Sequence, residues 1–230
     1  MSNQSNIEII PAVMPRSLND LEEHISRVVG SAPLVQIDVM DGVFVRGKTW
    51  PYISFDAKAF EFEFEGLPHW EDIDYEFDLM IKNPEKEIDR FVTLGASRII
   101  FHIESTEKIG EAIKLAREKD LEVGLAINID TPNETLEEFI PDIDFVQFMG
   151  IATIGLQGEP FDKRVVEKIS SFRKKFPDVI ISIDGGVGME NISELVKAGV
   201  DRLVAGSAIF KNENTHGAIG DLYNTANNAI

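Results

Sequence analysis

VQIDVMDGVFV, residues 35–45, begins as an apolar strand and then runs into two aspartates and a glycine. A parallel strand buried on both faces is nearly continuous in apolar residues, so Asp38 and Asp41 mark the carboxyl end of this one. Gln36 lies two residues before Asp38 and therefore faces the same side of the strand. In folds built from parallel strands, active and ligand-binding sites lie at this end of the strands. The stretch therefore predicts a parallel α/β fold with a functional site at the carboxyl ends of its strands.

The same pattern recurs along the chain, with each short apolar run followed by a stretch of helical periodicity. The predicted strands are 7–14, 34–40, 75–81, 98–104, 122–128, 145–149, 179–185 and 202–208. Eight such units predict a (β/α)8 TIM barrel that forms a single domain over residues 1–230. A doubly wound open sheet is the alternative, although it seldom keeps so many regular units.

Local signals mark where the intervening helices begin. Ser17, with Asp20 three residues later, resembles a capping box. Pro84 and Pro132 each occupy a position suited to the first turn of a helix. Residues 46–74 break the regular spacing and predict an extended βα segment, within which 59–66 alternates like an exposed strand. An elaborated loop is the simpler interpretation, and a lid or a subunit contact is the alternative.

Composition limits the class of protein and its partners. The chain has no cysteine, which excludes disulfides and thiolate metal sites, and its 43% hydrophobic content is that of a soluble globular protein. We expect a cytoplasmic protein, since no apolar run approaches the roughly 20 residues that span a bilayer and no secretory signal is evident. The net charge of −18 disfavours nucleic acid and anionic membranes. An anionic small substrate would need a strongly local anion site.

Three aspartates follow apolar runs at predicted strand ends. Asp38, Asp78 and Asp184 are each flanked by apolar residues, which directs their carboxylates into the barrel mouth. Because a buried, unpaired carboxylate is costly, the set predicts a site. Internal salt bridges and loop-capping hydrogen bonds are the alternatives.

His102 is the only histidine on a predicted strand. We expect a core imidazole bonded to a backbone carbonyl, with a supporting role beside the site as the alternative. The remaining histidines are expected to face solvent: His24, His69 and His216.

Two glycine-rich turns follow the last two predicted strands, in IDGGVGMEN (183–191) and VAGSAIF (204–210). Glycine lets the backbone approach a ligand closely, and these two turns commonly hold phosphate in barrels. The expected phosphate site comprises Gly185, Gly186, Gly206 and Ser207, and ordinary turn chemistry is the alternative. Gly150, Gly155 and Gly158 are expected to form a third wall of this pocket.

In order and spacing, IIPAVMP, VQIDVMDGVFV, FDLMIKNPE, IFHIES, IDGGV and VAGSAIF resemble the ribulose-phosphate 3-epimerase family. The resemblance implies a barrel enzyme that inverts C3 of a phosphorylated ketose through an enediolate, with Asp38 and Asp184 as acid and base. It also implies a divalent metal held by these aspartates and two histidines, methionines against the reacting carbons, and a homo-oligomer. The matching methionines are Met40, Met80 and Met149.

The sequence departs from the family pattern at positions that the resemblance assigns to the active site. Gln36 and Asp78 stand where the family has its two histidines, and Ala12 replaces a serine. The DVMDG stretch lacks the lysine of the related decarboxylase motif, which disfavours that branch.

Three hypotheses follow from these departures. The first is an all-oxygen site of Asp38, Asp78, Asp184 and Gln36 that prefers Mg²⁺ or Mn²⁺ to Zn²⁺. The second is a metal-free site in which Gln36 and a protonated Asp78 donate hydrogen bonds to the enediolate. The third is a non-catalytic relative that binds a sugar phosphate. We expect an epimerase or isomerase that binds a small phosphorylated sugar, with Gln36, Met40, Asp78, Met80 and Met149 lining its substrate site.

Overall fold

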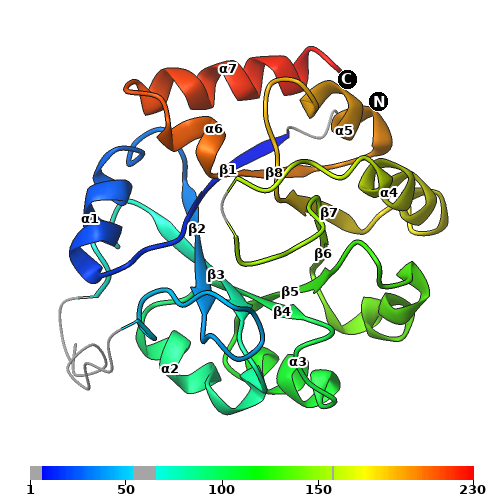
Figure 1. Cartoon of the computed structure of the whole chain (residues 1–230). Helices are drawn as coiled ribbons and strands as arrows, with labels where there is room; N and C mark the ends of the chain where they lie inside the picture. Colours follow the sequence, from blue (N-terminus) through cyan, green and yellow to red (C-terminus); the bar gives the residue numbers. More distant parts are fainter. Residues whose placement is uncertain (1–6, 54–65, 157) are drawn as a thin grey trace.

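The computed structural model describes residues 7–53, 66–156 and 158–230, and its eight parallel strands close into a barrel in chain order (Figure 1). The strands are β1 (Glu8–Val13), β2 (Leu34–Met40), β3 (Asp74–Met80), β4 (Arg98–His102), β5 (Glu122–Ile127), β6 (Phe145–Met149), β7 (Ile180–Asp184) and β8 (Arg202–Ala205). β1 pairs in parallel with both β2 and β8, which closes the sheet. The predicted TIM barrel is confirmed.

Helices surround the barrel (Figure 1). They are α1 (Leu18–Ser26), η2 (Pro84–Lys86), α2 (Ile88–Thr93), α3 (Ile109–Arg117), η3 (Asn133–Asp142), α4 (Arg164–Lys175), α5 (Ile192–Ala198), α6 (Ser207–Phe210) and α7 (Thr215–Asn227). The segment after β5 is a 3₁₀ helix instead of the expected α-helix, and it contains Pro141, which cannot donate a helical hydrogen bond. Within the described ranges, no helix is long and apolar enough to cross a membrane.

The start signals at Ser17 and Pro84 are confirmed, whereas Pro132 lies at the N-cap of η3 and not in its first turn. Ser17 Oγ accepts a hydrogen bond from Asp20 N at 3.1 Å, which caps α1. The Asp20 carboxylate, however, accepts from the Arg16 backbone N–H, one residue earlier than a capping box requires. Pro84 opens η2, and α2 then begins separately at Ile88.

The barrel interior is layered along its axis. Buried apolar side chains such as Ile10, Ile100 and Phe145 fill the middle. Phe145 occupies space that Gly124 leaves on the neighbouring strand, where a Cβ atom would lie 2.4 Å from the ring. Charged residues close the amino-terminal end, and the predicted site residues occupy the carboxyl end.

An ion network closes the amino-terminal end of the barrel. Arg98 Nε lies 2.8 Å from Glu122 Oε2, and Arg202 Nη2 lies 2.8 Å from Glu122 Oε1. Glu8 approaches both arginines, at 3.7 and 3.1 Å. Glu76 is fully buried here, and its nearest cation is Arg98 Nη1 at 3.8 Å. Burial raises the pKa of Glu76 from 4.5 to about 8, because Arg98 and Arg202 only partly offset the desolvation of its carboxylate.

This shift predicts a pH-dependent contribution to stability. Between pH 4.5 and about 8, Glu76 holds its proton in the folded protein and loses it in the unfolded chain. The free energy of unfolding should therefore fall as pH rises through this window, by at most about 1.4 kcal/mol per pH unit from this group. Glu76→Gln should remove that slope in chemical denaturation series collected at successive pH values. Parallel wild-type and variant curves would contradict it.

Candidate active site

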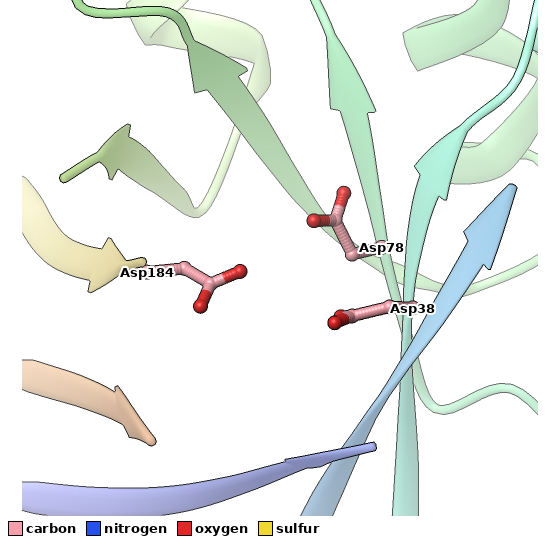
Figure 2. Close-up of side chains that lie close together, drawn as sticks. All are labelled: Asp38, Asp78 and Asp184. Carbon is pink, nitrogen blue, oxygen red and sulfur yellow. The ribbon is translucent and has the colours of Figure 1, made fainter. Parts of the chain in front are cut away.

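Three carboxylates meet at the carboxyl end of the barrel (Figure 2). Asp38 on β2 and Asp78 on β3 are register partners, and Asp184 on β7 faces them from across the mouth. Each contributes an oxygen to a group whose atoms lie within 4.8 Å of one another. The expected convergence of the three strand ends is therefore observed, since parallel strands present their carboxyl ends on one rim.

Gln36 connects two of these three carboxylates, those of Asp38 and Asp184. Its side chain is fully buried, and Nε2 donates hydrogen bonds to Asp38 Oδ1 at 2.8 Å and to Asp184 Oδ2 at 3.1 Å. Gln36 Oε1 is buried and has no hydrogen-bond partner among the described residues. One amide group thus connects carboxylates on opposite walls of the barrel.

Asp78 belongs to a separate buried network. His102 Nε2 lies 2.9 Å from Asp78 Oδ1, and Gln147 Nε2 donates to Asp78 Oδ2 at 3.4 Å. Gln147 Oε1 in turn accepts from Ser182 Oγ at 3.1 Å. The backbone-carbonyl partner expected for His102 is thus wrong, because β4 directs the imidazole into the barrel beside β3. Burial opposes charge on His102, but the Asp78 carboxylate raises the pKa of the imidazole overall.

The environment of Asp38 and Asp184 favours their protonated forms. Burial, followed by repulsion from Asp184 and Asp78, raises the pKa of Asp38 well above its usual value. Burial and the charge of Asp78 raise the pKa of Asp184 to about 7, although the Gln36 hydrogen bond opposes the shift. A pair of adjacent carboxylates in such a site can hold a proton near neutral pH, as acid/base chemistry requires.

A pocket of about 230 Å³ opens above these groups. The predicted residues that line it are Asp38, Met80, Met149, Asp184, Gly185, Gly186, Gly206 and Ser207. Gln36, Asp78 and Met40 are buried beneath its surface, where Met40 packs with Met80 and Val45. Eight of the residues expected to line the site therefore line this pocket, whereas Gln36, Asp78 and Met40 are buried and do not.

The glycine turns require glycine at specific positions. Gly185 and Gly186 have φ values of +99° and +69°, a region that other residues seldom adopt. A Cβ on Gly206 would lie 3.1 Å from the Ala12 carbonyl oxygen. Gly155 and Gly158 line the pocket as expected, but Gly150 does not. Gly150 instead packs behind the turn, where a Cβ would lie only 2.3 Å from the Gly185 carbonyl oxygen.

Residues 8–210 match the ribulose-phosphate 3 epimerase family. The chain belongs to this family. It is 30% identical to ribulose-phosphate 3-epimerase of Schizosaccharomyces pombe over 95% of this chain and 93% of the relative. It is also 30% identical to the Bacillus subtilis enzyme of the same name, over 94% of this chain and 98% of that one. A solved structure of 3-hexulose-6-phosphate synthase from Salmonella typhimurium shares the fold, with a TM-score of 0.71 at 15% identity over 97% and 100% of the two chains.

This member of the epimerase family has an unusual set of candidate metal ligands. The three aspartates provide oxygen donors only, whereas Gln36 turns Nε2 and not Oε1 toward Asp38 and Asp184, so the expected glutamine ligand is not in place. Oxygen donors suit a hard divalent cation, so the cluster can hold such an ion. Neither of the two positions at which the family has histidine carries an imidazole here. His102, on β4, contacts one of these positions, Asp78.

The segment after β2 supports the site from outside. Thr49 Oγ1 donates to the Asp38 carbonyl oxygen at 2.7 Å and accepts from Met40 N at 2.9 Å, which holds the end of β2 in place. Asp41 accepts from the backbone N–H groups of Val43, Phe44 and Lys82, so it organises loops and does not line the pocket. The strand expected at 59–66 lies almost entirely outside the described residues, and the lid and subunit-contact hypotheses are untested.

Two basic residues are among the pocket residues that the sequence did not indicate. His24, expected to face solvent, is half-buried, lines the pocket and packs edge-on against Phe210. Lys211 is the only lysine or arginine among the described residues that line the pocket. The sequence could have indicated Lys211 through its position four residues after Ser207, because residues four apart share one helical face. His69 and His216 are exposed, as expected.

Proposed function

We propose that this protein is a ribulose-phosphate 3-epimerase, in which Asp38 and Asp184 are the acid and base that invert C3 of a ketopentose phosphate. The observation that carries the proposal is the placement of these two carboxylates on opposite walls of one pocket, in a chain that belongs to the epimerase family. The raised pKa of each supports it, because one member must be protonated while the other is ionised.

The reaction needs one proton transfer on each face of C3. The ionised aspartate removes the C3 proton, and the electrons of the C–H bond move toward the C2 carbonyl oxygen to give an enediolate. The protonated aspartate then delivers its proton to the opposite face of C3, which forms the inverted centre. Each turnover exchanges the protonation states of the pair, so the reverse reaction uses the same groups. Gln36 donates to both carboxylates and thereby holds them facing the substrate.

The remaining pocket residues fit a small phosphorylated sugar. Backbone groups of the turns at Gly185, Gly186, Gly206 and Ser207 would hold the phosphate, and Lys211 would add a cation in an otherwise acidic protein. Met80 and Met149 offer apolar surface beside the aspartates. A homo-oligomer stays a prediction from the family resemblance.

A divalent cation held by Asp38, Asp78 and Asp184 would supply positive charge beside the enediolate oxygen. The oxygen-only donor set favours Mg²⁺ or Mn²⁺ over Zn²⁺.

The test is solvent exchange at C3. In deuterium oxide, the wild-type protein should incorporate deuterium at C3 of ribulose 5-phosphate and form its C3 epimer, as followed by NMR. Unphosphorylated ribulose should react far more slowly, because it cannot use the glycine turns. Binding of the sugar phosphate without exchange, with or without added Mg²⁺ or Mn²⁺, would instead indicate a non-catalytic binding protein.

A further inference from the structure

Asp78 differs from the other two aspartates of the cluster in its surroundings. Asp38 and Asp184 line the pocket, whereas Asp78 is fully buried and does not. Both of its carboxylate oxygens instead have side-chain partners in the barrel interior, His102 Nε2 at 2.9 Å and Gln147 Nε2 at 3.4 Å. A bound sugar can therefore touch Asp38 and Asp184, while Asp78 can act on the reaction only through a cation held between the three.

The contact between His102 and Asp78 is a hydrogen bond donated by the imidazole. An imidazole is ordinarily the stronger base, so the proton between the two groups belongs to Nε2 and the carboxylate accepts it. Gln147 donates to the second oxygen, and its own Oε1 accepts from Ser182 Oγ at 3.1 Å, which fixes the direction of the amide. Residues on β4, β6 and β7 thus determine how the Asp78 carboxylate is oriented.

The His102 ring is itself held by packing. It is fully buried, and the Phe44 ring, from the loop after β2, lies against it with the ring centroids 5.5 Å apart. Ser105 Oγ donates to the His102 carbonyl oxygen at 2.7 Å, which secures the end of β4. The imidazole therefore offers its Nε2–H to Asp78 from a fixed place.

This arrangement leaves Asp78 able to bind a cation. A carboxylate has about four lone-pair sites, and the two hydrogen bonds use two of them. One oxygen from each of Asp38, Asp78 and Asp184 lies within 4.8 Å of the others. Partners that orient a metal-binding carboxylate or imidazole contribute strongly to affinity, because the ligand is already in place when the ion arrives.

We propose that His102 is a positioning residue, whose imidazole holds the Asp78 carboxylate as the fixed anchor of a hard divalent cation. Asp78 then keeps the cation in place while Asp38 and Asp184 exchange the proton. The imidazole acts through Asp78 and is not a ligand itself. The inference rests on the proposed function and adds to it the residue that secures the cation beside the enediolate.

The experiment measures binding of Mn²⁺ alone, with no sugar present, from the electron paramagnetic resonance signal of the free ion. His102→Leu should weaken Mn²⁺ binding by about 10–100-fold, as loss of an outer partner of a metal ligand does. His102→Gln should stay within about threefold of wild type, because its amide nitrogen can replace the Nε2 donor. If circular dichroism shows the leucine variant to be unfolded, His102→Asn takes its place, since its amide is too short to reach Asp78.

The matched control is Ser105→Ala. It removes a buried hydrogen bond at the same strand end, to the backbone of His102, and Ser105 does not contact Asp78. Mn²⁺ affinity in this variant should stay within about threefold of wild type even if the melting temperature falls.

Three results would overturn the inference: wild-type protein that binds no Mn²⁺, His102→Leu with the affinity of wild type, and equal losses in the leucine and glutamine variants. C3 exchange is measured separately on the same preparations at saturating Mn²⁺. Its absence in the wild-type protein would remove the proposed function, whereas the Mn²⁺ titrations alone decide the role of His102.

Discussion

Asp38→Asn and Asp184→Asn are each expected to lower the kcat of C3 epimerisation by about 10³–10⁴-fold, because an amide can neither accept nor deliver the proton. The two variants should differ in solvent exchange. With only one aspartate left, the base on that face can still remove and return the C3 proton of one epimer without inversion. Each variant should therefore exchange deuterium into a different epimer, which NMR can follow for the two substrates separately.

Stability provides the control for this prediction. The pKa of Asp38 is raised by burial and by its two neighbouring carboxylates, and that of Asp184 by burial and Asp78, so the folded state disfavours both charges. Replacing either with asparagine should leave the melting temperature unchanged or raise it, because the neutral amide removes a charge that the folded state disfavours. Retained inversion in either variant, or exchange into the same epimer by both, would show that the acid and base are assigned incorrectly.

Gly150→Ala is expected to lower kcat/KM by about 100-fold or more, although Gly150 does not line the pocket. A Cβ at this position would lie 2.3 Å from the Gly185 carbonyl oxygen, and a backbone atom cannot move aside as a flexible side chain can. Gly150 N also donates to the Asp184 carbonyl oxygen at 2.6 Å. Any shift that relieves the contact must therefore displace the acid/base residue and the phosphate turn together.

The fold should also lose about 1–3 kcal/mol of unfolding free energy in this variant, as overpacked sites do. Gly220→Ala is the matched control, since Gly220 lies within α7 and its Cβ would meet nothing within 4 Å. That change should leave activity intact and stabilise the protein by about 0.5–1 kcal/mol. Near-normal turnover by Gly150→Ala, measured beside this control, would show that the turn has more freedom than its contacts imply.

The barrel, and the rim on which its chemistry lies, could be predicted from the amino-acid sequence. Alternating apolar runs and helical stretches specify parallel strands, and the carboxyl ends of parallel strands lie on one side of a sheet. Asp38, Asp78 and Asp184 could thus be grouped without knowing the register between their strands. The same rule located the glycine turns, because it depends only on where each strand ends.

The hydrogen-bond partners of the buried side chains, in contrast, depend on how the whole barrel packs. Gln36 and Asp184 are 148 residues apart, and their hydrogen bond requires barrel closure and side-chain rotamers that no local pattern encodes. The same holds for His102, whose partner is a carboxylate on the neighbouring strand β3 instead of a backbone carbonyl. Gly150 was misplaced for a related reason, since its tight contact is with the backbone of a different strand end. Periodicity specifies the direction in which a side chain points, whereas distances of a few ångströms across the barrel are set by the packing of all the strands together.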